Sequence, residues 1–145
     1  MHCNPTSARG RGYIIVDIDY FTKWVEVMST YVEDGKTSTL FLFNHVISRF
    51  GVLQAIVTNH KSHFCNQMMA ELSAKLGFRH EKSTLYYLQA NGQVETINKV
   101  LNTILRRMVG DHKSNWNLTL FSALWVYRTL VKTTTISHYF SWFMD

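Results

Sequence analysis

The sequence predicts a single mixed α/β domain, and three observations support this fold class. Two strand patterns lie next to each other near the N-terminus, and helical patterns then alternate with further short strand patterns. This order is typical of helices packed against a mixed sheet. The length of 145 residues suits one domain, and 46% apolar residues suffice for a core. We expect a flexible lead-in over residues 1–12 and the domain over residues 13–145.

The first half of the domain contains a strand pair, a helix and a third strand. Tyr13–Asp19 is rich in β-branched residues, and after a turn a second strand is expected around Trp24–Met28. Glu33–Gly35 precedes apolar residues at helical spacing, which predicts a helix that ends at Gly51. Gln54–Thr58 is short and apolar, as in a buried strand.

The second half alternates helices with one more strand. A helix is expected near Asn66–Leu76, followed by a strand over Phe78–Ser83. The pair Asn91-Gly92 predicts a turn that opens a long helix reaching Met108. A last helix is expected over residues 115–130.

Composition argues against a membrane protein and a disulfide scaffold. No apolar run approaches the ~18 residues of a membrane span, and Cys3 and Cys65 are too few for a disulfide framework. We therefore expect an intracellular protein. The net charge of +5 lies mainly in residues 96–145, which hold six basic and two acidic residues. This basic segment is compatible with a polyanion partner and equally with a solvated helix face.

The polar segment from Tyr86 to Glu95 is the strongest candidate for a functional site. It places aromatic rings, amides and one carboxylate in a loop that enters a helix. A carboxylate in the first helical turn is stabilised in its charged form by the helix dipole, which suits a metal ligand. The same position equally suits an ion pair between Glu95 and Lys99, four residues later.

Several blocks in order resemble the motifs of one known family. YIIVDIDYFTKWVEV at Tyr13–Val27 is similar to that family's YILVAIDYFTKWVEA. RFG at residues 49–51 and IVTN at residues 56–59 are similar to RFG followed by IVTDNG. YYLQANGQVETINK at Tyr86–Lys99 resembles YYPQANGQVEATNK, and WVYRT at residues 125–129 resembles WAYRT. With these blocks the chain resembles the integrase catalytic core of gypsy-type LTR retrotransposons, a member of the ribonuclease H-like superfamily.

The resemblance implies a ribonuclease H-like mixed sheet flanked by helices and a polynucleotidyl transferase site. In this family two Asp and one Glu hold two Mg²⁺ or Mn²⁺ ions, which activate a water or a DNA 3′-hydroxyl for attack on a phosphate. It also implies DNA as partner and a nuclear location, although the chain has no Lys/Arg-rich import cluster.

This chain departs from the family pattern at the metal ligands. Glu95 is retained, but the second Asp is replaced by Asn59, with the family's spacing of 35 residues between the two positions. The first Asp belongs to a strand before Tyr13, and no such strand is recognisable in residues 1–12. Asp17 and Asp19 share a strand face, so either is a candidate substitute. We expect a weak, incomplete metal site at Glu95 and an enzyme that is inactive.

The missing first strand also has a consequence for folding. In this family it lies centrally, between the Tyr13 strand and the Gln54 strand. We therefore expect two half-sheets with unpaired edges and marginal stability. Proline is also absent at three positions where the family has it, and these are occupied by Leu85, Leu88 and Tyr139.

Nucleic-acid binding is expected to persist in a weak, non-specific form. The candidate contacts combine basic, amide and aromatic side chains around the long helix, with either Tyr86 or its neighbour stacking on an unpaired base: Tyr87, Asn91, Gln93, Lys99 and Arg106. The alternatives are a homodimer or protein-interaction module that uses exposed sheet edges and the last aromatic helix, and a remnant without function.

Overall fold

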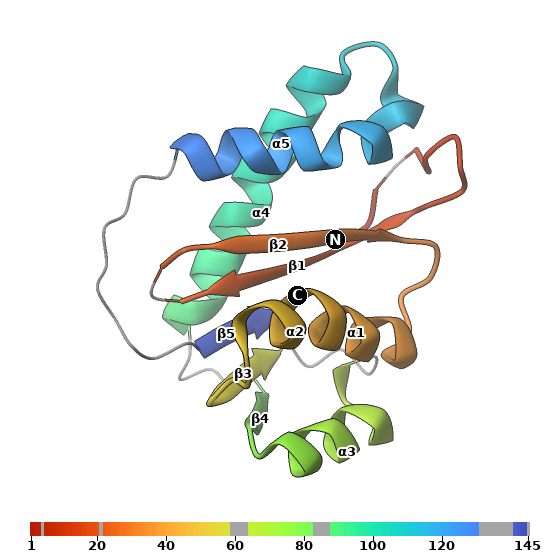
Figure 1. Ribbon diagram of the computed structural model, residues 1–145. Helices are drawn as coiled ribbons and strands as arrows, with labels where there is room; N and C mark the ends of the chain where they lie inside the picture. Colours follow the sequence, from red (N-terminus) through yellow and green to blue (C-terminus); the bar gives the residue numbers. More distant parts are fainter. Residues whose placement is uncertain (4, 21, 59–63, 83–87, 131–140, 145) are drawn as a thin grey trace.

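A five-stranded mixed sheet lies in the middle of the molecule with helices on both of its faces (Figure 1). The computed structural model describes residues 1–3, 5–20, 22–58, 64–82, 88–130 and 141–144, with the backbone alone at residues 88–91 and 141–144. The strand order is β2-β1-β5-β3-β4. This architecture confirms the predicted α/β fold class.

The predicted strands are all present. β1 (Tyr13–Asp19) and β2 (Val25–Thr30) form an antiparallel hairpin in which Tyr13 faces Thr30 and Ile18 faces Val25. β3 (Ala55–Thr58) and β4 (Arg79–Lys82) form a parallel pair.

The expectation of two separate half-sheets was wrong, because a fifth strand joins them. β5 (Ser141–Met144) lies between β1 and β3, antiparallel to the first and parallel to the second. It occupies the central position that the resemblance assigns to a first strand (Figure 1). Both edges of the gap therefore find backbone partners inside the chain.

The helices agree with the predicted ones except at one boundary. A continuous helical run contains α1 (Gly35–Phe41), η1 (Leu42–Ile47) and α2 (Ser48–Phe50). The other long helices are α3 (Gln67–Leu76), α4 (Leu88–Val109) and α5 (Trp116–Leu130). None of the described helices combines the length and apolar character of a membrane span.

The long helix starts earlier than predicted. Asn91 and Gly92 lie inside α4, so the turn expected there was wrong. A glycine inside a helix costs about 1 kcal/mol relative to alanine. The buried side chains of Val94, Ile97 and Leu101 pack on the sheet and outweigh that cost.

The two faces of the sheet carry separate cores. Ile14, Val16 and Ile18 of β1 point towards α4 and α5, with Leu101 and Leu120 among the residues that they pack with. Ile15 points the other way, towards the core formed with α1–α2 and α3. Because side chains alternate along a strand, Asp17 and Asp19 also point away from α4.

An unusual pair of carboxylates lies opposite each other on the hairpin. Asp17 of β1 is paired in register with Glu26 of β2, and both side chains are buried. Glu26 accepts hydrogen bonds from Trp24, from Arg49 at 3.0 Å and from Arg128 at 2.9 Å. Neither Asp17 carboxylate oxygen has a hydrogen-bond partner among the described residues. Burial raises the pKa of Asp17 well above 3.8. The backbone of Ile18 acts in the opposite direction, and the charges of Glu26 and Asp19 add to the rise.

Replacing Asp17 with asparagine is expected to stabilise the protein at neutral pH. A raised folded-state pKa means that the folded protein binds the proton more tightly than the unfolded chain. The contribution of Asp17 to the free energy of unfolding is therefore most favourable below its unfolded pKa of 3.8, and it declines as pH rises through the raised folded-state pKa. Asp17→Asn should raise the melting temperature at pH 7, and the gain should shrink towards pH 4.

Thermal melts followed by circular dichroism at several pH values test this expectation. Asp111→Asn is the matched control, because it removes an exposed carboxylate from the turn between α4 and α5. The control should have little effect. If Asp17→Asn raised the melting temperature equally at all pH values, the effect would not come from ionisation of Asp17, and the prediction would be wrong.

Candidate metal and nucleic-acid site

The described candidate contacts lie mainly along one face of α4. With 3.6 residues per turn, Glu95, Lys99 and Arg106 fall on the same side of the helix. All three side chains are exposed, whereas Val94 and Leu101 point into the core. The apolar stripe thus holds α4 against the sheet and turns the polar face towards solvent.

Some of the predicted site residues cannot be placed. Asn59, Tyr86 and Tyr87 lie outside the described residues. Asn91 lies near the start of α4, but its side chain is not among those described. The geometry of the site therefore rests on the part of α4 from Gly92 onwards.

Glu95 is an isolated carboxylate within the described structure. It is exposed, and no hydrogen bond or ion pair joins it to Lys99 or to another described side chain. No group of three or more His, Cys, Asp or Glu side chains among the described residues is arranged to hold a metal ion. A divalent cation needs several oxygen ligands, preferably anionic ones. The described residues do not fit such an ion.

Gln93 is separated from the other candidate contacts. Two residues before Glu95, it lies about 160° away around the helix. Its side-chain oxygen accepts a hydrogen bond from Lys23 Nζ at 2.6 Å. Lys23 follows β1 in the hairpin turn and also donates to the backbone oxygen of Tyr20. Gln93 therefore connects α4 to the hairpin.

Lys23 contacts the predicted site residue Gln93, and the sequence did not indicate this contact. Its amino group lies 4.5 Å from the centre of the Tyr20 ring, in a cation–π contact. Burial lowers the pKa of Lys23, and the charge of Asp19 acts in the opposite direction. The only signal in the sequence was its place in the YFTKW block between two strands. The hydrogen bond between Lys23 and Gln93 joins residues 70 apart in the sequence, and a local sequence pattern does not indicate such a contact.

Neither of the two aspartates of β1 joins Glu95 in a described metal cluster. Asp19 accepts a hydrogen bond from the backbone N–H of Thr22 at 3.2 Å, which stabilises the hairpin turn. Asp17 lies opposite Glu26 in the sheet and is fully buried. Both point to the face of the sheet that α4 does not cover.

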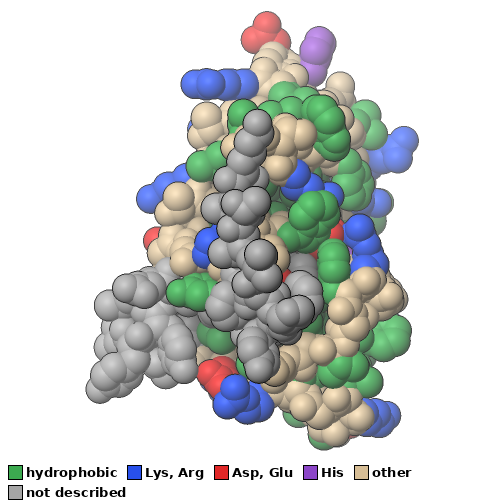
Figure 2. Space-filling view, turned by 60° about the vertical axis from the view of Figure 1, so that its left-hand side comes forward, with side chains coloured by type: hydrophobic (Ala, Val, Ile, Leu, Met, Phe, Trp, Pro, Cys, Tyr) green, Lys and Arg blue, Asp and Glu red, His purple; other side chains and the backbone are tan. Residues whose placement is uncertain are grey.

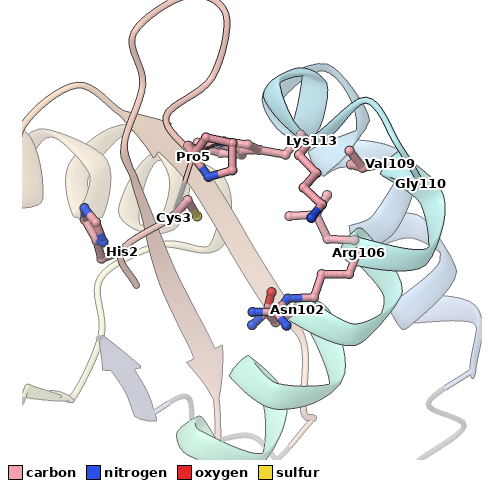
Figure 3. Close-up of a pocket in the computed structure, with 10 residues that line it drawn as sticks. His2, Cys3, Pro5, Asn102, Arg106, Val109, Gly110 and Lys113 are labelled. Atoms are coloured by element: carbon pink, nitrogen blue, oxygen red, sulfur yellow. Dashed lines mark hydrogen bonds between the residues drawn. The ribbon is translucent and has the colours of Figure 1, made fainter.

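Arg106 lines a cavity of about 330 Å³ at the C-terminal end of α4. Figure 3 shows Asn102, Arg106 and Lys113 on one side of this cavity and the N-terminal segment with His2, Cys3 and Pro5 on the other. Trp116 Nε1 donates to the backbone oxygen of Pro5 at 3.1 Å and holds the two sides together. None of the described lining residues is acidic, so the cavity suits an anionic group.

Comparison with known proteins relates the chain to retroviral Pol proteins. It is 30% identical over 117 residues to the Pol polyprotein of Radiation murine leukemia virus (strain Kaplan), covering 80% of this chain and 20% of that protein. It is 23% identical over 125 residues to the retrovirus-related Pol polyprotein from transposon 412 of Drosophila melanogaster, covering 86% and 10%. The chain thus spans at most a fifth of these relatives. No protein-family model matches it.

Solved structures agree with this relation at the level of the fold. The simian T-cell lymphotropic virus intasome, in complex with PP2A regulatory subunit B56 gamma, contains a chain that matches with a TM-score of 0.72 and 22% identity. That match covers 95% of this chain and 47% of the other. The HTLV-2 integrase catalytic core domain, in complex with magnesium and in a trimeric form, matches with a TM-score of 0.65 and 21% identity. That match covers 81% of this chain and 74% of the other.

The sequence similarity and the shared fold lead to one conclusion. The chain is homologous to a region of the Pol polyproteins of retroviruses and related transposons, and it has the fold of a retroviral integrase catalytic core.

Proposed function

We propose that this chain is an integrase-like core domain that binds nucleic acid weakly and does not catalyse strand transfer. The observation that carries this proposal is the pair Asn59 and Glu95, which keeps the spacing of the family's Asp and Glu but has an amide in place of one carboxylate. We further propose that the chain derives from the gypsy-type branch, because its motifs resemble those of that branch.

The charge of the ligand set supports the loss of activity. Mg²⁺ is a hard cation that keeps its waters unless anionic oxygens replace them. Replacing Asp by Asn keeps one carbonyl oxygen but removes one negative charge from the ligand set. Within the described structure, Glu95 belongs to no group of three or more His, Cys, Asp or Glu side chains that could hold a metal ion. We therefore derive no metal-dependent step for this chain.

The exposed face of α4 supports the proposal of nucleic-acid binding. Lys99 and Arg106 are two helical turns apart, about 10 Å along the axis. Both are exposed, and neither has an ion-pair partner among the described residues. Free cations on a rigid helix suit phosphate contacts that position a nucleic acid without reading its sequence. Arg106 and Lys113 on the cavity wall extend this basic surface.

A second candidate function, a protein-interaction module, is favoured by the outer face of α5. Three large apolar side chains on this face are strongly exposed: Leu118 at 60%, Phe121 at 62% and Trp125 at 67%. Figure 2 shows exposed hydrophobic side chains beside lysine and arginine side chains on the face in view. Exposed apolar stripes of this kind mark contact surfaces. A defined oligomer without affinity for DNA, measured by light scattering, would favour this function.

The prediction about metal binding compares the natural chain with a variant in which a carboxylate is restored at position 59. Calorimetric titration with MgCl₂ or MnCl₂ should show no saturable binding to the natural chain, because one carboxylate is too few. Asn59→Asp should create measurable binding at the same metal concentrations. Asn44→Asp is the control, since it adds the same charge at an exposed position on η1 and should not create it.

Saturable binding of two ions by the natural chain would contradict the proposed defect, as would metal-dependent strand transfer. In that case Asp145→Asn shows whether Asp145, which follows β5 directly in the sequence, supplies the missing carboxylate. Strand-transfer assays on the same preparations give an independent readout.

The nucleic-acid prediction concerns the salt dependence of binding. Lys99→Ala and Arg106→Ala should each weaken binding to a labelled DNA duplex, and each should reduce the slope of log K against log salt by about 0.9. Fluorescence anisotropy at several salt concentrations measures both quantities. Arg107→Ala is the matched control, because Arg107 has the same charge but lies about 100° around the helix. Equal effects of all three variants would contradict a defined binding face.

A further inference from the structure

The centre of the sheet is filled by the last strand of the chain. β1, β2, β3 and β4 all precede β5 in the sequence, yet β5 lies between β1 and β3. Asp17–Asp19 of β1 pair with Trp142–Met144, and all four residues of β3 pair with Ser141–Met144. Before β5 is added, β1 and β3 therefore present two facing rows of unpaired backbone groups, a ready-made slot for a strand.

The N-terminus limits the length of this slot. One edge of β1 is occupied by β2 along residues 13–18, so any other partner of β1 must use the opposite edge. His2 forms an antiparallel bridge with Tyr13, and Met1 exchanges backbone hydrogen bonds with Ile14 at 2.7 and 2.8 Å. The N-terminal residues thus cover the start of the edge whose other end pairs with β5. Only a short strand fits the space that remains.

The slot does not distinguish the chain's own strand from the same strand of another copy. The partners of β5 are backbone groups of β1 and β3, together with the packing of α4 against it. Residues 141–144 carry no charge, so backbone pairing rather than an ion pair directs their insertion. Ten residues connect α5 to β5 in the sequence, enough to extend over about 33–36 Å.

From these observations we propose that the slot is a strand-exchange site, in which Ser141–Met144 of a second copy inserts between β1 and β3. Two copies that exchange this segment form a dimer and keep every backbone pair of the monomer. The monomer avoids the entropy cost of association. The fraction of protein in the exchanged dimer therefore increases with protein concentration. The partner is another copy of the same chain, and the proposal does not depend on metal or DNA binding.

A cross-link between two single-cysteine chains tests the exchange directly. In a background of Cys3→Ser and Cys65→Ser, one full-length chain carries Asp17→Cys and the other Met144→Cys. Residues 17 and 144 are antiparallel partners, and the separation of such partners falls within the range that a disulfide spans. The chains are mixed unfolded, refolded together and oxidised. Each has one cysteine, so a disulfide between positions 17 and 144 must join two molecules.

The expected result is a covalent dimer on non-reducing gels, with the 17–144 linkage identified by mass spectrometry. Two controls should lose it. Phe143→Pro in the Met144→Cys chain removes a backbone donor from β5. A chain with Leu118→Cys in place of Met144→Cys presents an exposed thiol on α5 instead.

Two outcomes would overturn the proposal. One is a 17–144 linkage no more abundant than the control linkage to position 118. The other is a dimer by light scattering without the 17–144 linkage, which would place the contact on the exposed face of α5. The pair Ile18→Cys and Phe143→Cys, which are also antiparallel partners, repeats the test if the first pair does not refold.

Discussion

The backbone edges of β1 and β3 impose the constraint on which the rest of the structure depends. A buried N–H or C=O without a partner costs about as much as a lost hydrogen bond, so the middle of a sheet cannot be left open. β5 closes this gap from one end of the chain, and the first three residues cover the remaining part of the β1 edge from the other end. A continuous sheet then offers the apolar face on which α4 and α5 rest.

The two buried carboxylates of the hairpin, Glu26 and Asp17, lie in different electrostatic environments. Glu26 receives two arginines, Arg49 from α2 and Arg128 from α5, so that one buried charge ties helices from both faces to β2. Arg128 also donates to the backbone oxygen of Val25 and lies 4.0 Å from the centre of the Trp24 ring. Asp17 has no such cation among the described residues, and its burial favours the neutral acid. A buried charge without a partner destabilises the fold. A buried charge that is paired with a cation, as Glu26 is, connects the helices and strand that carry the pair.

The candidate site combines an exposed helix face with a single carboxylate on α4, that of Glu95. The position of Glu95 on α4, its exposure and the neighbouring cations Lys99 and Arg106 follow from the apolar stripe that seats the helix. Within the described residues the integrase-like fold persists without a cluster of metal-ligating side chains around Glu95, because packing and metal binding use different side chains. The basic side chains of α4 are likewise separate from those that pack in the core, so this face of the helix is compatible with weak binding of a nucleic acid.

Local patterns in the sequence determined the β1–β2 hairpin, the positions of β3 and β4 and, apart from the start of α4, the spans of the long helices, because periodicity and caps act within a few residues. The spacing of Asn59 and Glu95 was likewise readable, together with the family that it resembles. Three features were decided only by tertiary structure. β5 was not predicted. A segment of four residues is too short to indicate a strand by itself, and this one becomes a strand because it pairs with β1 and β3, which are distant in the sequence. The start of α4 at Leu88 depends on packing that overrides an Asn-Gly turn signal. The contact between Lys23 and Gln93 joins residues 70 apart in the sequence, and only the fold brings them together.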